Sequence, residues 1–522
     1  MDRPVFEIRR MDAAGRLGRL EIPRADVTVE TPALLPVVNP NHQQIPPARL
    51  ADEFGAEILI TNAYLISQDE TLHSGARNHG LRELLDFSGA IMTDSGSFQL
   101  AEYGDVDITT EEILAFQDAI GSDIATPVDI PTPPDADRTR AETDLEVTSE
   151  ALAVSHAFEA GTMLRTAPIQ GGRFPDLRES AARAAYQRGF DIYPIGAMVP
   201  LLRQYRFDVI AELVAAAKRG LGADAPVHLF GAGHPMMFSL GVALGCDLFD
   251  SAAYALYARE DRYLTPTGTR RLEHLQYLPC SCPVCSASTP DALRAESAET
   301  RERMLAEHNL YVTFAEMRRV KQAITQGELL ELVETRARAH PWLLDGYRVL
   351  LEQRDLLESA EPATAARPFF YLSSESATRP EVRRHHERLE RLAVPDLLVL
   401  IDPAIDEELP GEHPWTDSTT IPIHADEDGT TRWYVIPPFG PVPPALLETY
   451  PLTAELPRCR DLAAYTAAAA GIQALVSAHD TNVTLLHDGW PAETLRRLPQ
   501  TVDIRHGRRE QDSSGPTADS EP

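Results

Sequence analysis

Lysine is nearly absent from this chain of 522 residues, since only Lys218 and Lys321 among its 48 basic residues are lysine. Its 79 acidic residues give a formal net charge of -31, a surplus typical of proteins kept soluble in a salt-rich cytoplasm, although a merely acidic protein is the alternative. Such a charge argues against a nucleic-acid partner held by long-range attraction. High salt screens that attraction, so arginine clusters, stacking and shape could still bind RNA.

Long apolar runs are missing as well. None approaches the roughly 18 to 20 residues needed to cross a bilayer, and no cationic and then apolar leader opens the chain, so we expect a soluble, cytoplasmic protein with no membrane partner. Cysteine is scarce, with five in all, and Cys246 and Cys459 are expected to be small core residues. No Gly-x-Gly-x-x-Gly motif follows the first predicted strand, which argues against a dinucleotide-binding fold.

Apolar segments and helical patterns alternate from about residue 50, with one pair every roughly 20 to 40 residues. Thr109 and Glu112 can open one of these helices as a capping box. Seven or eight such units in about 250 residues predict an α/β protein with a (β/α)8 TIM barrel, and a doubly wound open sheet is the alternative. Residues 1–50 suit a β-hairpin and a lead-in loop. The predicted strands are residues 56–60, 90–93, 123–129, 166–170, 191–196, 227–230 and 246–250.

The apolar run 89–92 ends at a turn that contains Asp94, Ser95 and Phe98. A carboxylate, a hydroxyl and an aromatic ring at a strand end suit a functional site, although Asp94 or Ser95 could simply cap the next helix. Similar side chains recur where other predicted strands end, and a barrel brings those ends to the one face where barrel enzymes do their chemistry. They are Asp129, Gln170, Gly196, Phe230 and Asp250.

Two carboxylates at strand ends, Asp94 and Asp250, permit double displacement at an anomeric carbon, in which one attacks while the other moves the proton. The rings of Phe98 and Phe230 and a third carboxylate, Asp129, suggest a planar ring held between two faces and read along its edge.

Three cysteines, Cys280, Cys282 and Cys285, stand at Cys-x-Cys-x-x-Cys spacing before a long helical stretch that carries His308. Clustered cysteines in a cytoplasmic protein suggest a metal, and these four ligands would close a tetrahedral zinc site with no position left for substrate. We therefore expect a structural zinc. His274 and His340 are also near enough in sequence to be the fourth ligand.

The C-terminal part divides by composition. Residues 346–367 are expected to hold a helix end and a linker rich in Ala, Pro, Glu and Thr. Two smaller α+β domains are predicted over residues 368–450 and 451–506, and residues 507–522 form a polar tail that we expect to be disordered.

The segments 94–99 and 249–251, together with Cys280, Cys282, Cys285 and His308, resemble the tRNA-guanine transglycosylase family over most of residues 1–345. Segments 247–257, 368–371 and 439–443 are similar to its archaeal branch, which acts in archaeosine formation, and the composition suggests a halophilic archaeon. The resemblance implies a catalytic barrel over residues 1–345 with a zinc subdomain at about 270–326, one structural Zn²⁺ per subunit and a homodimer. It also implies that guanine at position 15 of the tRNA D-loop is exchanged for 7-cyano-7-deazaguanine, without a nucleotide cofactor.

The resemblance also implies roles for individual residues. Asp250 would attack the ribose anomeric carbon and expel guanine, and Asp94 would be the general acid and base. Asp129 and Gln170 would hydrogen-bond the edge of the base, because an ionised carboxylate accepts from the N1-H and the exocyclic amine of guanine. The rings of Phe98 and Phe230 would sandwich the base beside the Ser95 turn. The backbone at Gly196 and Ala197 would face the substituent of the incoming base.

Three departures from the family pattern bear on these expectations. Ser97 stands where relatives usually have a second glycine, which should be tolerated if its φ is negative. Residues 199–202 lack the Glu of bacterial members, which favours an uncharged nitrile. Archaeal members usually end in an RNA-binding PUA domain. Such a domain would start near residue 507, where the predicted tail begins, so a separate chain, such as archaeosine synthase, is expected to help hold the tRNA. The alternative functions are a tRNA-binding paralogue without exchange activity and a retaining glycoside hydrolase on the same barrel.

Overall fold

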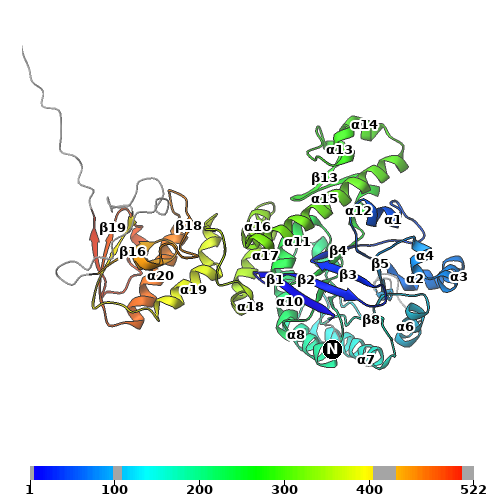
Figure 1. Cartoon of the computed structure of the whole chain (residues 1–522), viewed down its shortest axis with the longest axis horizontal. Helices are drawn as coiled ribbons and strands as arrows, with labels where there is room; N and C mark the ends of the chain where they lie inside the picture. The colour runs from blue at the N-terminus through cyan, green and yellow to red at the C-terminus, as the bar shows by residue number, and fades with distance from the viewer. Residues whose placement is uncertain (1–4, 98–107, 404–430, 508–522) are drawn as a thin grey trace, which may run out of the picture. The chain divides into compact units, whose positions relative to one another are not determined.

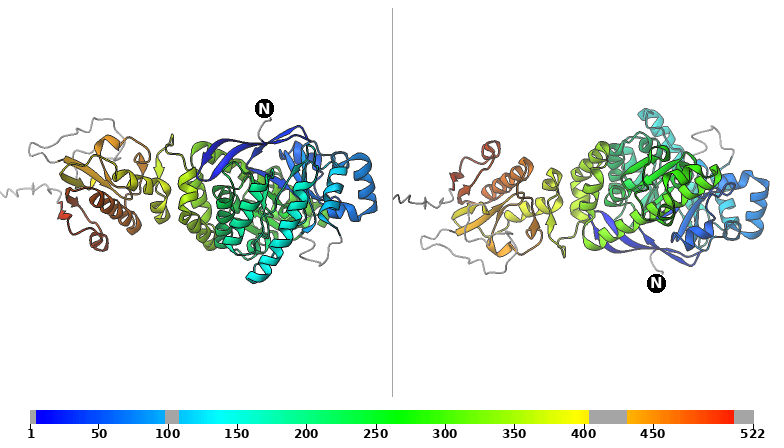
Figure 2. Two further views of the ribbon diagram at one scale, coloured as in Figure 1. Left: turned by 90° about the horizontal axis from the view of Figure 1, so that it is seen from below. Right: turned by 90° about the horizontal axis from the view of Figure 1, so that it is seen from above.

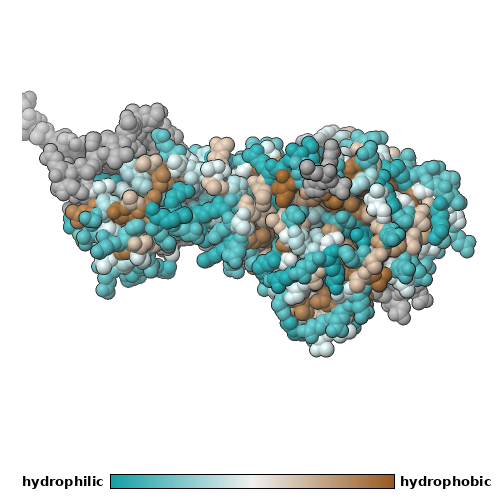
Figure 3. All heavy atoms as spheres, turned by 60° about the horizontal axis from the view of Figure 1, so that its bottom comes forward, coloured by the Kyte–Doolittle hydropathy of each residue, from teal (hydrophilic) through white to brown (hydrophobic). Residues whose placement is uncertain are grey.

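The computed structural model describes residues 5–97, 108–403 and 431–507. The chain divides into two compact units, Met1–Pro362 and Ala363–Pro522. On the face drawn in Figure 3, hydrophilic residues cover most of the surface and hydrophobic residues form small separate patches, as expected of an acidic chain. No helix within the described ranges has the length and apolar character that a membrane span requires.

The first unit opens with an antiparallel sheet of three strands, which lies on the outer surface of the unit near the N-terminus (Figure 2). Only a hairpin and a loop were predicted for residues 1–50. The third strand, β3, and the short strand that follows it were missed because Pro32 and Pro36 give this segment the composition of a loop. The sheet strands are β1 (Phe6–Asp12), β2 (Gly15–Ile22) and β3 (Val27–Thr31).

Eight short parallel strands follow, in two sheets of four with orders β4-β11-β10-β9 and β5-β6-β7-β8. Isolated parallel bridges connect the two sheets, Val37 with Ile60 at one junction and Thr166 with Ile192 and Ile169 with Ile195 at the other. The strands are β4 (Ala33–Pro36), β5 (Ile58–Asn62), β6 (Ala90–Asp94), β7 (Ile124–Ala125), β8 (Leu164–Arg165), β9 (Tyr193–Ile195), β10 (Val227–Leu229) and β11 (Leu248–Ser251).

Both faces of these strands are apolar, which is expected of parallel strands covered on each side. Alternate residues contribute to different clusters: Ile58 and Ile60 pack with Met92 of the next strand, whereas Leu59 packs with residues of the surrounding helices. The cluster that holds Ile58 also contains Leu20 and Ile22 of the N-terminal sheet, which covers it. The chain therefore has mixed α/β structure with parallel sheets, which is consistent with the predicted barrel.

Helices alternate with the parallel strands and lie around them (Figure 1). The predicted capping box opens α6: the Thr109 hydroxyl accepts from the Glu112 N-H at 3.2 Å, and the Glu112 carboxylate accepts from the Thr109 N-H at 2.9 Å. The helices up to β11 are α1 (Pro47–Asp52), α2 (Ala63–Gln68), α3 (Glu70–His79), α4 (Leu81–Leu85), α6 (Thr110–Ala119), α7 (Arg138–Ala157), α8 (Pro175–Arg188), α9 (Val199–Arg203), α10 (Phe207–Gly220) and α11 (Pro235–Ala243).

After β11, α12 (Ala253–Arg259) leads into an antiparallel hairpin, β12 (Arg262–Thr265) and β13 (Gly268–Arg271). Two short helices then precede the 29-residue helix α15, and they lie together beside its N-terminal part in Figure 1. The remaining helices of the unit are α13 (Pro283–Ala287), α14 (Pro290–Ala295), α15 (Ala298–Gln326), α16 (Leu329–Ala337), α17 (Pro341–Glu352) and α18 (Arg354–Ala360).

The second unit contains a five-stranded sheet of order β17-β16-β15-β19-β20 and a separate strand pair, β14 with β18. Strands from before and after residue 450 share the larger sheet. The division of this unit into two domains at residue 450 stays a prediction. The predicted tail, residues 507–522, lies outside the described residues from 508 onward. The elements are β14 (Phe369–Phe370), α19 (Pro380–Leu389), β15 (Leu397–Ile401), β16 (Thr431–Ile436), β17 (Gly440–Val442), β18 (Ala454–Glu455), α20 (Leu462–Ala478), β19 (Asn482–His487), α21 (Ala492–Leu495) and β20 (Asp503–His506).

Candidate active site and metal group

The parallel strands place their carboxyl ends on one side of the first unit, and the predicted site residues follow those ends. Asp94 and Asp250 lie within β6 and β11. Gly196 and Phe230 come directly after β9 and β10. Asp129 and Gln170 come four and five residues after β7 and β8, in connections that the ends of the strands position.

Asp94 is the last residue of β6, where it pairs in register with Asn62 of β5. Burial, followed by the charges of Asp129 and Asp250, raises the pKa of Asp94 to about 7, against the backbone N-H groups of Ser95 and Gly96, which lower it. Asp129 and Asp250 are therefore both close enough to repel a charge on Asp94. A carboxyl group with this pKa can both give and take a proton near neutral pH.

Two described neighbours, Gly231 and His228, approach the same side-chain oxygen of Asp250. Its Oδ1 accepts a hydrogen bond of 2.8 Å from the backbone N-H of Gly231, and the Nε2 atom of buried His228 lies 3.0 Å from the same oxygen. The Asp250 side chain keeps 13% of its surface exposed, whereas that of His228 keeps none. A carboxylate that is anchored through one oxygen and still reachable is suited to nucleophilic attack.

Asp129 and Gln170 form one buried hydrogen-bonded pair. The Gln170 amide donates to Oδ2 of Asp129 at 2.5 Å, and its own carbonyl oxygen Oε1 is buried with no hydrogen-bond partner among the described residues. Burial raises the pKa of Asp129, while hydrogen bonds from Gln170 and Ser97 lower it. A paired carboxylate and an orphaned amide oxygen together offer acceptors to a ligand that carries N-H donors.

The turn after β6 depends on Gly96, whose φ is +92°. A Cβ at this position would also lie 2.6 Å from the Cβ of Tyr64, so glycine is required on both grounds. Ser97 does not have a positive φ, so the condition for tolerating serine there is met. Its hydroxyl accepts from the Asp129 backbone N-H at 3.0 Å and lies 2.9 Å from the hydroxyl of buried Ser95, which ties the turn to the Asp129 loop.

Arg178 of α8, a nearly fully buried arginine, holds the loop at Gly196 and Ala197. Its guanidinium donates to the carbonyls of Ile169, Gly172 and Gly196 at 2.7, 3.0 and 2.9 Å. Burial lowers the pKa of Arg178 to about 9, against the charge of Asp129, which raises it. Ala197 has a φ of +60°, a costly conformation for a residue with a Cβ, and such outliers concentrate at functional sites.

One of the two predicted ring platforms is described. Phe230 is partly buried, and its ring lies edge-on to His228 with the ring centroids 4.7 Å apart. Phe98, the other platform, lies outside the described residues.

Two residues that shape the site, Arg178 and His228, were not found by sequence reasoning, and Ser97 was considered only as a replacement for a glycine. Arg178 lies in a helix whose other charged residues are solvated, so nothing in the local pattern marks it as buried. His228 does carry a signal, because it is a single polar residue inside the apolar strand β10. Polar residues are rare in strands that are buried on both faces, so His228 could have been recognised as a candidate site residue.

The second expected group is assembled as predicted. Single ligand atoms of the four predicted residues all lie within 4.8 Å of one another, a group that could hold a metal ion. The Nδ1 atom of His308 lies 3.5 Å and 3.3 Å from the sulfur atoms of Cys282 and Cys285. Its Nε2 atom lies 2.9 Å from the carbonyl of Leu264, a contact that places the ring proton on Nε2 and leaves Nδ1 free to bind a metal. The group consists of Cys280, Cys282, Cys285 and His308.

The two alternative histidines lie elsewhere. His274 is exposed beside Glu273, and His340 stacks on Tyr205 with ring centroids 4.9 Å apart. The ring of Tyr263 instead stacks on His308 at 3.6 Å.

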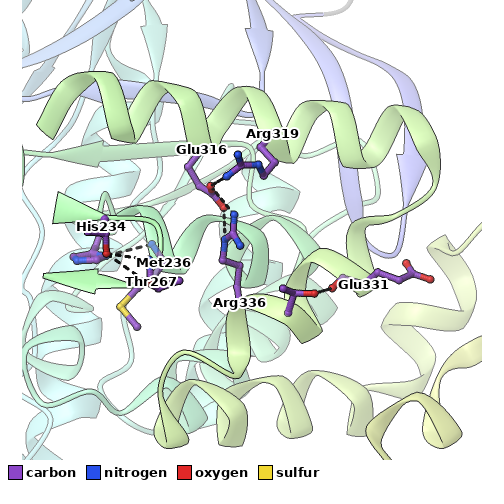
Figure 4. Close-up of polar contacts among 9 residues, drawn as sticks. His234, Met236, Thr267, Glu316, Arg319, Glu331 and Arg336 are labelled. Atoms are coloured by element: carbon purple, nitrogen blue, oxygen red, sulfur yellow. Dashed lines mark hydrogen bonds and ion pairs between the residues drawn. The ribbon is translucent and has the colours of Figure 1, made fainter. Parts of the chain in front are cut away.

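The same long helix is fixed to the rest of the unit by a buried carboxylate (Figure 4). Glu316 of α15 accepts from Arg319 at 2.8 Å and from Arg336 of α16 at 2.7 Å. In the same view His234 caps α11, because its Nδ1 atom accepts from the Met236 N-H at 3.2 Å. Burial lowers the pKa of His234 to about 4, so the ring stays neutral and can act as this acceptor.

These observations define an α/β protein with a carboxylate-lined site at the carboxyl ends of its parallel strands and a separate Cys3His group that could bind a metal. The model of the family described as queuine tRNA-ribosyltransferase matches residues 12–342, which include both groups. The chain belongs to this family.

Relatives resemble the chain over most of its length. A tRNA-guanine(15) transglycosylase of Haloferax volcanii is 58% identical over 96% of this chain and 93% of its own length. Proteins of the same name from Haloarcula marismortui and Methanosarcina mazei are 57% and 50% identical. The first of these alignments covers 96% of this chain and 98% of the relative, and the second covers 88% of each.

Proposed function

We propose that this chain is a pentosyltransferase that catalyses the reaction for which its relatives are named, the exchange of guanine at position 15 of tRNA. The incoming base is 7-cyano-7-deazaguanine, which makes this the first step of archaeosine formation. The observation that supports the proposal best is the trio of carboxylates at the strand ends. Asp250 is anchored and still reachable, Asp94 has a pKa of about 7, and Asp129 is paired with Gln170.

In the first step, a carboxylate oxygen of Asp250 attacks C1′ of the ribose, and the bond from C1′ to N9 of guanine breaks. Asp94 gives its proton to the departing base, which leaves a ribosyl ester on Asp250 and a carboxylate at Asp94. In the second step, Asp94 takes the N9 proton of the incoming base, N9 attacks C1′, and the ester bond breaks. The Asp250 carboxylate is restored, and two inversions retain the configuration at C1′.

Base recognition falls to the buried pair and to the loops beside it. The Asp129 carboxylate accepts from the N1-H and the exocyclic amine, and Gln170 supplies a further contact along the same edge. Phe230 supports the ring together with Phe98, next to the turn at Ser95. The backbone at Gly196 and Ala197 faces the nitrile, and residues 199–202 supply no carboxylate that would attract a cationic aminomethyl group.

The parallel strands are proposed to close into a (β/α)8 barrel, with the zinc subdomain at about 270–326 attached to a catalytic domain of residues 1–345. The bridges from Val37 to Ile60 and from Thr166 to Ile192 support closure, because they connect the two four-stranded sheets at both junctions. Residues 346–367, 368–450 and 451–506 then form the linker and two C-terminal domains.

Zn²⁺ is the metal that suits three thiolates and one imidazole, because such ligand sets bind it tetrahedrally at about 2.0 to 2.3 Å. The site would have no open position, so its role would be structural. We expect chelation to unfold the region around α13, α14 and the start of α15, as seen by loss of protection in hydrogen exchange. An apo-protein with unchanged exchange protection would contradict a structural zinc.

A homodimer is proposed, with tRNA bound through its D-loop. The excess of 31 negative charges also suggests that a separate RNA-binding chain, a PUA-containing protein such as archaeosine synthase, helps to hold the tRNA. Full-rate exchange by the purified protein alone, in high salt, would argue against such a partner.

The proposal is tested by incubating purified protein with tRNA and 7-cyano-7-deazaguanine in molar KCl, followed by mass spectrometry of the nucleosides. We expect 7-cyano-7-deazaguanosine at position 15 and release of one equivalent of guanine. Binding of tRNA without base exchange would instead favour a divergent paralogue. Hydrolysis of simple glycosides without action on tRNA would favour a glycoside hydrolase.

A further inference from the structure

His228 has a place in the site that the reaction outlined above does not use. It lies on β10, in parallel register with Leu248 of β11, and its side chain is fully buried. Its Nε2 atom lies 3.0 Å from Oδ1 of Asp250, and its ring is nearly perpendicular to that of Phe230, at an interplanar angle of 77°. The imidazole therefore contacts the proposed nucleophile from the buried side of the site.

The contact with Asp250 is close but poorly aligned. Neither Nδ1 nor Nε2 of His228 makes a directional hydrogen bond to any part of the chain that the structure describes. A buried polar group left unpaired costs roughly 1–3 kcal/mol, which evolution tolerates mainly where the group has another task. Hydrogen bonds in active sites are often poorly aligned without substrate and tighten when it binds.

The two neighbours of Asp250 act on the same oxygen. The Gly231 N-H donates to Oδ1, and the Nε2 atom of His228 also approaches Oδ1 rather than Oδ2. Oδ2 thus keeps its lone pairs free of these two partners. The asymmetry assigns different tasks to the two oxygens, with Oδ1 as the anchor and Oδ2 as the atom that attacks.

We propose that His228 is a positioning residue for the nucleophile: its Nε2-H donates to Oδ1 of Asp250 and directs Oδ2 toward C1′. This inference rests on the proposed function. In the first step Oδ2 forms the bond to C1′ while the C1′–N9 electron pair leaves with the base. In the second step the C1′–Oδ2 electron pair returns to Asp250, and the Nε2-H stabilises the carboxylate charge that builds up on Oδ1.

The Nε2-H of His228 therefore acts in both displacement steps. It holds the carboxylate before attack, and it favours departure of the carboxylate from the ribosyl ester. The Nε2-H is present in the corresponding neutral tautomer and in the imidazolium, so this role does not require the ring to change its protonation state.

Three substitutions separate this role from simple packing. In His228→Gln the side-chain amide can reach the position of Nε2 and donate, whereas in His228→Asn the amide reaches only the position of Nδ1. His228→Leu has a similar volume and no donor. Each variant is compared with the wild type by thermal unfolding and by tRNA affinity, which a positioning residue should leave nearly unchanged.

The decisive measurement is a single-turnover experiment in molar KCl that follows two steps separately. Release of labelled guanine, together with formation of the enzyme–RNA adduct, reports attack. Decay of the adduct after addition of free base reports the second displacement. We expect the Leu and Asn variants to slow both steps by about 10- to 100-fold, the range for loss of a hydrogen bond to a charged group, and the Gln variant to stay within about 10-fold of wild type.

Equal rates for the Gln and Asn variants, or wild-type rates for the Leu or the Asn variant, would overturn the inference. If the Leu variant fails to fold, the comparison of Gln with Asn still decides, because both retain a polar amide. Failure of the wild-type protein to release guanine would count against the proposed function itself. That outcome is distinguishable because it is read before any variant is made.

Discussion

Asp247 directly precedes β11, and Asp250 lies near the carboxyl end of that strand, three residues later; the surroundings of the two carboxylates differ. Asp247 is fully buried and saturated: it accepts from Nε of Arg16 at 3.0 Å, from a second guanidinium nitrogen of the same residue, and from the Val227 N-H at 2.8 Å. Asp250 has one well-aligned donor and remains partly exposed. The contacts before the strand tie the fold together, whereas the partly exposed carboxylate near its carboxyl end suits the proposed reaction.

The contrast extends to the neighbours of each carboxylate. Arg16 also donates to the carbonyls of Ala223 and Ala225 at 2.6 and 2.8 Å, so it ties the N-terminal sheet to the loop before β10. At the other end, negative charges crowd together and raise the pKa of Asp94. Opposite charges pair at the amino end of the strand, and like charges lie close together at the carboxyl end, where the reaction is proposed.

The largest effect should follow from Asp250→Asn. The amide keeps the shape of the carboxylate and can no longer attack, so exchange of labelled guanine into tRNA should disappear while the thermal unfolding temperature changes little. The matched control at the other end of the strand is Asp247→Asn, which should leave exchange per folded molecule intact. Exchange that survives in Asp250→Asn would refute the assigned nucleophile.

Asp94→Asn should be the next most severe change. We expect turnover to fall by roughly 10² to 10⁴, the usual contribution of a general acid or base, with tRNA affinity retained. The measurement is steady-state exchange beside a direct binding assay on the same protein. Turnover close to that of wild type would remove Asp94 from the proton-transfer role.

Asp247→Asn tests the structural end of the comparison. Removing one partner of a buried ion pair leaves Arg16 as an uncompensated buried charge, which typically costs about 3–5 kcal/mol of stability. Chemical denaturation should show a lower midpoint for the first unit, with residual exchange activity in proportion to the folded fraction. A variant that folds with wild-type stability but exchanges no base would reverse the assignment of the two ends.

The smallest effect concerns the pH dependence of stability. The pKa of Asp94 is about 7 in the folded chain and about 3.9 in an unfolded one, so between these values the folded state holds a proton that the unfolded state has released. The free energy of unfolding therefore falls as pH rises from about 4 to 7 on account of this group.

Asp94→Asn cannot ionise and escapes that loss. The unfolding temperature of the variant relative to wild type should therefore be higher at pH 8 than at pH 5, by a few degrees. A constant difference between variant and wild type across this pH range would show that the carboxyl titrates normally.

Much of this organisation could be predicted from the sequence, because the signals are local. Apolar runs that end in Asp94 and Asp250 are short-range patterns, and the Cys-x-Cys-x-x-Cys spacing of the metal group is a nearly self-sufficient motif. The capping box at Thr109 depends on residues only three positions apart. Each of these features can be deduced without knowing which strands are neighbours.

Other features depend on contacts between distant segments. The pair of Arg16 with Asp247 joins residues 231 positions apart, and neither residue has a local pattern that marks it. The carbonyls that Arg178 binds lie in two different loops, which only the strand order brings together. The bounds of β8 also differ from the prediction, because residues 166–170 form isolated bridges rather than a continued ladder.

The central claim is that Asp250, rather than any other carboxylate at the strand ends, carries the ribose between the two bases. It is tested most directly by quenching the wild-type enzyme with denaturant during turnover, isolating the enzyme–RNA adduct, and locating the modified residue by proteolysis and mass spectrometry. The account predicts a ribosyl ester on Asp250 and no adduct with Asp250→Asn. An adduct on Asp94 or Asp129, or one that persists in Asp250→Asn, would contradict it.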